Sequence, residues 1–303
     1  MKWKRGRGRS QIENRRGQGG AGAFGGFGGG GGGFPLPIPR GAGLGLGGVV
    51  VIGILLLVLF LSGGLGGGGG FDIPGTNLPA MPEGPGLTGT GPDAELADFV
   101  AFVVDDVQTA WQENFRSAGR TYQVTKLVLF DGATQSGCGQ ATSETGPFYC
   151  PVDRKLYLDL DFFRELRNRF GAPGDFAQAY VIAHEFGHHV QTLLGTETRV
   201  REEQERRPEE ANELSVRMEL QADCYAGAWA HSAYAEGQLE GGDVEEALAA
   251  ASSVGDDRIQ RSAGQRVDPE TWTHGSSEQR VQWFNIGFRD GDPSSCDTFS
   301  ASI

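Results

Sequence analysis

The most informative part of the sequence is VIAHEFGHHVQ, residues 181–191. His184 and His188 are four positions apart, so on a helix they lie on one face about one turn apart. Both imidazoles can then reach one metal ion, and Glu185 completes the pattern H-E-x-x-H. In that pattern the glutamate approaches a water on the metal without being a ligand itself. The stretch therefore predicts two metal ligands and a general base on one helix.

The alternative is a solvated helix with incidental histidines. Three of the chain's five histidines, however, fall within residues 184–189, and the flanking positions Val181–Ala183, Phe186–Gly187 and Val190 carry no charge. Such a helix is expected to be buried, and a buried neutral imidazole needs polar partners. The metal-binding interpretation is therefore favoured.

A catalytic zinc ion usually takes three protein ligands and leaves one position for water. Glu219 lies 31 residues after His188 on a long predicted helix, within the apolar sequence SVRMELQADCYAGAWA. Asp223 is four positions further on, hence on the same face. We predict that Glu219 is the third ligand and that Asp223 accepts the Nδ1–H of a ligand histidine. The alternative is that both acids face solvent.

Other polar side chains are weaker candidates. His274 precedes a predicted helix that Ser276–Ser277 could cap, and it is either an electrophile for a tetrahedral intermediate or purely structural. Helix geometry turns His189 about 100° away from His188, so packing is predicted for it. Tyr180 and Tyr225 could donate to an oxyanion, but aromatic packing is favoured for both. His231 is assigned to an ordinary helical position, and Arg280 to pairing with an acid near the site.

Apolar periodicity after residue 92 predicts a mostly helical α+β domain with a small sheet. The predicted helices cover residues 94–117, 161–170, 176–194, 209–235, 244–253 and 277–289. The predicted strands cover residues 122–130 and 155–160. The charged segment EEQERRPEE, residues 202–210, is predicted to be an exposed loop or a frayed helix.

The first third of the chain has a different composition. It contains 32 of the 50 glycines, within residues 1–91, and residues 41–61 carry no polar side chain. Twenty-one residues at the helical rise span about 30 Å, the thickness of a hydrocarbon core. We predict a transmembrane helix over residues 41–62 and a Gly/Pro-rich linker over 63–92; a cleaved signal peptide is the alternative. The globular domain is then 93–303.

Eight Lys or Arg residues and one acid lie in residues 1–40, and no Lys or Arg follows Arg40 until Arg116. By the positive-inside rule, residues 1–40 form a cytoplasmic arm and the domain lies across the membrane. This orientation predicts a single-pass protein of the bacterial inner membrane with a periplasmic domain. The net charge of −13 argues against nucleic acid as a partner.

Four cysteines in an exported domain favour disulfides. Cys138 and Cys150 bracket a short loop, which favours their pairing and leaves Cys224 with Cys296. The other two connectivities stay open at this point. A zinc site built from these cysteines is less favoured because the chain has no C-x₂-C pair.

VIAHEFGHHVQ followed by ELQADCYAGAWA resembles the bacterial neutral zinc metallopeptidase family, a membrane-anchored group. The resemblance extends through GPFYCPVDRKLYLDLDFF, VGDDRIQ and THGSSEQRVQWF, and covers the anchor and nearly all of residues 93–299. The ligand pattern is also similar to that of the gluzincins, H-E-x-x-H with a later E-x-x-x-D. The resemblance implies a zincin-like fold and a hydrolytic Zn²⁺ site.

The expected function is zinc-dependent hydrolysis of a peptide bond in a peptide or protein substrate. Glu185 takes a proton from the attacking water and delivers it to the leaving amine. Two alternatives stay open. One is a membrane-tethered binding or assembly factor with a structural zinc, and the other is a zinc amidase that acts on cell-wall peptides.

Overall fold

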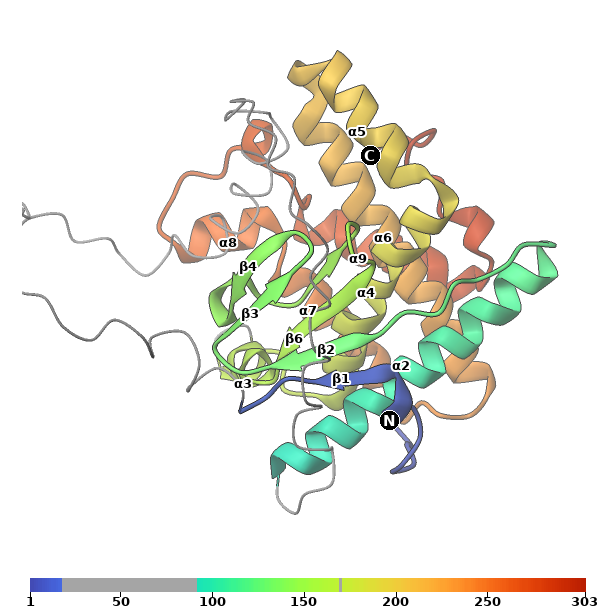
Figure 1. Cartoon of the computed structure of the whole chain (residues 1–303). Helices are drawn as coiled ribbons and strands as arrows, with labels where there is room; N and C mark the ends of the chain where they lie inside the picture. Colours follow the sequence, from blue (N-terminus) through green and yellow to red (C-terminus); the bar gives the residue numbers. More distant parts are fainter. Residues whose placement is uncertain (18–91, 169–170) are drawn as a thin grey trace, which may run out of the picture.

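The computed structural model describes residues 1–17, 92–168 and 171–303 (Figure 1). The helices are α2 (Pro92–Ser117), α3 (Asp161–Asn168), α4 (Asp175–Leu194), α5 (Thr196–Arg206), α6 (Ala211–Ala235), α7 (Asp243–Ser253), α8 (Asp256–Ser262) and α9 (Ser277–Asp290). The strands are β1 (Ile12–Asn14), β2 (Leu127–Phe130), β3 (Ala133–Ser136), β4 (Gly139–Thr142), β5 (Phe148–Cys150) and β6 (Lys155–Asp159). The predicted class, α+β and mostly helical with a small sheet, is confirmed.

The main sheet has four strands in the order β1-β2-β6-β5. The first three run parallel, and β5 pairs antiparallel with β6 through Phe148–Tyr157 and Cys150–Lys155. All four residues of β2 are buried, as expected for a central strand covered on both faces. Strands β3 and β4 form a separate antiparallel hairpin.

Helix α4, which carries the H-E-x-x-H stretch, lies at the centre of the helical part (Figure 1). It packs against α2, α6 and α7 and also contacts β5, while α6 runs along α9. Most of its side chains are buried, which explains why the sequence around the motif has no charge. Gly195 ends α4 in the left-handed conformation, with φ of 76°.

The structure adds elements that were not predicted. Strands β1, β3, β4 and β5 and helix α8 have no counterpart in the predicted set, and each is at most seven residues long. Short elements carry too few residues for a clear hydrophobic period. The predicted strand 122–130 is shorter in the structure, where only Leu127–Phe130 pair with neighbours.

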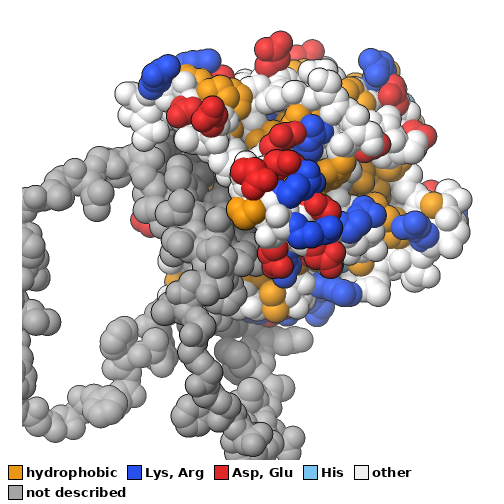
Figure 2. Space-filling model, turned by 90° about the horizontal axis from the view of Figure 1, so that it is seen from above, with side chains coloured by type: hydrophobic (Ala, Val, Ile, Leu, Met, Phe, Trp, Pro, Cys, Tyr) orange, Lys and Arg blue, Asp and Glu red, His pale blue; other side chains and the backbone are white. Residues whose placement is uncertain are grey.

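Of the two forms predicted for the charged segment 202–210, an exposed loop or a frayed helix, the structure shows the helical one. Its first part is the end of α5, and a 3₁₀ turn covers Pro208–Glu210. Acidic and basic side chains alternate over this face of the molecule (Figure 2), and Arg207 pairs with Glu203 and Glu210 along the chain. Such exposed pairs add little stability, so the segment serves mainly to keep this face solvated.

Residues 1–17 lie against the domain and do not form a separate arm. Strand β1 pairs in parallel with β2, with Ile12 opposite Leu127, and Met1 is buried in the main core. The predicted division into a 1–40 arm and a 93–303 domain therefore does not describe residues 1–17. The reason is that strand pairing and ion pairs with distant parts of the chain are invisible to local composition.

The predicted transmembrane helix at 41–62 and most of the predicted linker at 63–92 fall outside the described residues. Within residues 1–17, 92–168 and 171–303, none of the helices combines the length and apolarity needed to cross a bilayer.

Two disulfides join Cys138 to Cys150 and Cys224 to Cys296. This is the favoured one of the three possible connectivities, and it is confirmed. The first closes a short loop beside β5 and the second ties α6 to the C-terminal segment, closing 72 residues. In the chain-entropy model a loop of that length stabilises the folded state by about 4 kcal/mol.

Candidate metal centre

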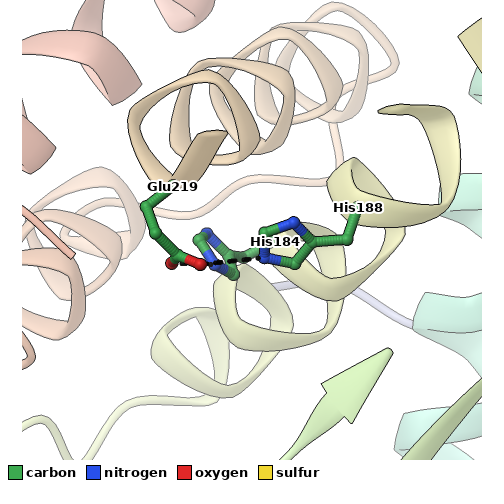
Figure 3. A group of neighbouring side chains, drawn as sticks. All are labelled: His184, His188 and Glu219. Atoms are coloured by element: carbon green, nitrogen blue, oxygen red, sulfur yellow. Dashed lines mark ion pairs between the residues drawn. The ribbon is translucent and has the colours of Figure 1, made fainter. Parts of the chain in front are cut away.

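The structure brings together the three predicted ligand side chains, His184, His188 and Glu219 (Figure 3). The Nε2 atom of His184 lies 3.2 Å from Oε2 of Glu219, and Nε2 of His188 lies 3.4 Å from Oε1 of the same carboxylate. One ligand atom from each residue lies within 4.8 Å of the other two. Three donors at this separation match one tetrahedral zinc ion with a position left for water.

Glu219 reaches the histidine pair because α6 comes unusually close to α4. At the crossing, Gly187 of the motif faces Ala222 of α6, and a Cβ atom on Gly187 would lie 2.9 Å from the Ala222 Cα. Any larger side chain at position 187 would push the two helices apart. Close packing of the two helices therefore explains the glycine within H-E-F-G-H, because it allows a carboxylate from α6 to approach two imidazoles from α4.

Hydrogen bonds orient both imidazoles toward the shared point. Nδ1 of His184 lies 2.8 Å from the Asp223 carboxylate, and Nδ1 of His188 lies 2.8 Å from Oε1 of Gln191. Both partners accept, so each Nδ1 carries the proton and each Nε2 presents a lone pair. Gln191 is held in turn by bonds to the Met218 carbonyl and the Gln221 side chain. Two lone pairs and a carboxylate facing one another fit a cation between them.

Asp223 is the centre of a buried network that sequence analysis described only in part. Arg280, from the first turns of α9, donates from Nε and Nη2 to the two carboxylate oxygens at 2.8 and 2.9 Å. The Tyr180 hydroxyl donates to the same carboxylate. Tyr180 was predicted to be a packing residue and is in fact a donor as well; Arg280 was linked only loosely to an acid. The predicted pairing of Arg280 with an acid near the site has Asp223 as that acid, whereas the bond from Tyr180 was not predicted, because Tyr180 lies 43 positions from Asp223.

Electrostatics at the network favour a fixed anion at position 223. Burial raises the pKa of Asp223, but Arg280 and His184 outweigh it and hold that pKa below its ordinary value. Burial alone would lower the pKa of His184. The carboxylates of Asp223 and Glu219 outweigh burial and raise this pKa to about 10. The site therefore attracts positive charge strongly, either as protons or as a metal ion that displaces them.

Glu185 lies on α4 beside the ligands but is not part of the group of three ligand atoms. Burial raises the pKa of its carboxyl, the two ligand histidines lower it, and the net direction is upward. The Tyr149 backbone on strand β5 also lies close enough to lower this pKa. A carboxylate with a raised pKa beside an open metal position is suited to accept and return a proton.

His274 lies near the site and is oriented by an acid. Its Nδ1 is 3.0 Å from Oδ1 of Asp256, and the other oxygen of Asp256 accepts the backbone N–H groups of Thr273, His274 and Gly275. The charge of His274 contributes to lowering the pKa of Glu219. Asp256 was not identified from sequence, because it belongs to the short helix α8, which was not predicted.

The remaining candidates have structural surroundings. His231 bonds to the Phe288 carbonyl through Nδ1, and Tyr225 packs edge-on against Trp111. A second acidic group, Asp175, Asp243 and Glu246, surrounds the α-amino group of Met1, which lies 2.7 Å from Asp175. That ammonium pairs with Asp175 and Asp243 and offsets one of the three negative charges.

His189 lies away from the ligands, as predicted, and packs between Tyr122 and Tyr149. Its Nε2 donates to the Gln123 carbonyl at 2.7 Å and its Nδ1 lies 3.1 Å from the Tyr149 hydroxyl. Burial is the main cause that lowers the pKa of this histidine to about 4, from an ordinary 6.5. The imidazole is therefore neutral in the folded protein.

This shift predicts acid sensitivity. The unfolded chain binds the proton more readily than the folded one, so stability contributed by neutral His189 is complete above pH 6.5 and is lost as the pH falls toward 4. The full loss is about 3 kcal/mol. We expect the free energy of unfolding, measured with urea at pH 7, 6 and 5, to fall less steeply in His189→Gln than in the native chain. Parallel slopes would contradict the assignment.

Comparison with known proteins gives the family of the chain. Residues 1–299 match the family model described as "Putative neutral zinc metallopeptidase". The uncharacterized protein YpfJ of Escherichia coli is 52% identical over 210 residues, or 69% of this chain and 73% of YpfJ. The uncharacterized proteins Mb2605 of Mycobacterium bovis and Rv2575 of Mycobacterium tuberculosis are each 50% identical over 192 residues, or 60% of this chain and 64% of theirs. No solved structure matches. Because the family model spans almost the whole chain, the protein belongs to the neutral zinc metallopeptidase family.

Proposed function

We propose that the protein is a zinc-dependent peptidase with a zincin-type site, in which His184, His188 and Glu219 hold the metal. The observation that carries the proposal is the convergence of these three donors beside Glu185, a carboxylate that takes no part in the cluster. Zinc bound there would supply a Lewis acid for the scissile carbonyl and lower the pKa of a water toward about 7.

Glu185 performs the proton transfers in this proposal. Its carboxylate takes the proton from the attacking water and later delivers it to the leaving amine. Burial, which raises its pKa, favours the protonated form that the second transfer requires. A purely structural metal site would have no use for such a group.

His274 is proposed to stabilise the negative charge that develops on the carbonyl oxygen. The Asp256 carboxylate accepts from Nδ1, so the opposite nitrogen is free to face a substrate. Donors placed where charge develops act strongly in a site that excludes water.

Strand β5 offers a place for an extended substrate. It is an edge strand of the main sheet, paired only with β6 among the described residues. The Tyr149 backbone lies near enough to lower the pKa of Glu185, so a peptide lying along β5 would pass the general base. Pairing of an extended peptide with a sheet edge needs no particular side chains, which favours peptide bonds as the substrate.

Metal removal tests the proposal. We expect the purified chain to contain about one zinc per molecule and to cleave unstructured peptides in a mixed peptide library. Treatment with a chelator should abolish cleavage, and added zinc should restore it. Zinc at full occupancy without cleavage of any library peptide would favour the binding factor with a structural zinc. Absence of zinc would refute the site itself.

A further inference from the structure

From its contacts with the domain, we infer that the N-terminal segment, residues 1–17, is an integral part of the domain's fold and occupies the same compartment as residues 92–303. This goes beyond the proposed function and does not depend on catalysis. It also replaces the orientation predicted from the basic residues, which puts the two parts on opposite sides of a membrane.

Backbone pairing joins the segment to the sheet. Residues Ile12–Asn14 pair in parallel with Leu127–Leu129, and the Arg15 N–H donates to the Leu129 carbonyl at 2.7 Å. The segment thereby covers the edge of β2, whose unpaired backbone groups would otherwise need another partner. Strand pairing requires both strands on the same side of any bilayer, because hydrogen-bonded neighbours lie about 5 Å apart.

The arginines that would hold the N-terminus in the cytoplasm have partners on α2. Asp98, whose side chain is 4% exposed, pairs with Arg9 at 2.6 Å and with Arg5 at 3.2 Å. Arg7 pairs with Asp105 at 2.7 Å. Both cations lie beside this nearly buried carboxylate, and a buried charge is costly unless it is paired. The basic cluster is therefore complementary to α2.

A glycine in the segment fits α2 closely. Gly8 has φ of 71°, and a Cβ atom there would lie 1.8 Å from the Ala101 carbonyl oxygen. Gly6 also has a positive φ, 96°, but a Cβ atom there would meet nothing within 4 Å. Trp3 packs edge-on against Phe99 of α2, with ring centroids 5.6 Å apart. The segment is thus fitted closely to α2 at Gly8 and at Trp3.

Two further facts support a shared compartment for residues 1–17 and the domain. The family model begins at residue 1, so the segment belongs to the same family unit as the metal site. The domain contains two disulfides, which form and persist in oxidising compartments. Residues 1–17 are therefore inferred to lie in that compartment too.

Thiol labelling in cells tests the shared compartment. All four native cysteines are in disulfides, so an engineered cysteine provides a single reactive thiol. We would express full-length Ser10→Cys and Ser262→Cys, both at exposed positions, and treat bacterial spheroplasts with a membrane-impermeant maleimide before and after lysis. The expected ratio of labelling before to after lysis is the same for both variants within about twofold, given similar thiol accessibility. Labelling of Ser10→Cys only after lysis, with Ser262→Cys labelled in intact spheroplasts, would overturn the inference.

Glycine substitution tests the docking. Gly8→Ala and Gly6→Ala both place an alanine at a positive φ, 71° and 96°, but only Gly8→Ala meets α2. We expect Gly8→Ala in the purified full chain to lower Tm by about 5 °C more than Gly6→Ala, since 1 kcal/mol corresponds to about 2–4 °C at this size. If Gly8→Ala does not fold while Gly6→Ala does, that result supports the docking as well. Equal Tm values would show that the segment does not pack against α2.

Discussion

Glu185→Gln is expected to lower kcat for peptide cleavage by about 10²–10⁴-fold while the zinc content stays at the native level. Glutamine has the size of glutamate but cannot take a proton from water. The three ligand side chains His184, His188 and Glu219 are unchanged in the variant, so the metal centre persists. Steady-state kinetics on a cleaved library peptide, with metal analysis of the same sample, measures both quantities.

The matched control is Glu202→Gln, an exposed glutamate on α5 that lies outside the site. It should leave kcat and zinc content unchanged. If Glu185→Gln retained native turnover after contaminating peptidases were removed, Glu185 could not be the general base. If it lost zinc together with activity, the glutamate would instead belong to the ligand set.

Arg280→Met is expected to weaken both the fold and the metal centre. The substitution leaves the fully buried Asp223 carboxylate without its bidentate partner, and breaking a buried ion pair in this way costs about 3–5 kcal/mol. Asp223 would then orient His184 less firmly, so zinc affinity should fall by about 10–100-fold. Urea unfolding and a competition assay against a zinc-binding dye measure the two effects.

Two companion variants separate the charge effect from loss of packing. Arg289→Met removes an exposed arginine of the same helix and should change neither stability nor zinc affinity. The double variant Arg280→Met/Asp223→Asn has no unpaired buried charge, so it should recover part of the lost stability without recovering zinc affinity. A single Arg280→Met variant with native zinc affinity would limit the role of Arg280 to folding.

The parts of the fold that were predictable are those with long hydrophobic periods. Helices α2, α4 and α6 each exceed four turns, and their predicted bounds agree with the structure within two residues. A long amphipathic or buried helix repeats its signal many times. Strand β1 has three residues and no such repetition, and its basic neighbours resembled a membrane-topology signal. Only the acids of α2, about 90 positions further along the chain, reveal what those arginines contact.

The candidate metal site could be predicted from residue spacing alone. His184, Glu185 and His188 are spaced for one helix, and Glu219 and Asp223 are spaced for another. Helix geometry alone orders such groups, because residues three or four positions apart are neighbours whatever the rest of the chain does. The surroundings of these groups became known only from the folded structure. Arg280 and Tyr180 contact Asp223, and Asp256 orients His274. The packing of residues 1–17 on α2 was likewise visible only there. These contacts join segments far apart in the chain, so they exist only once the core has brought the elements together.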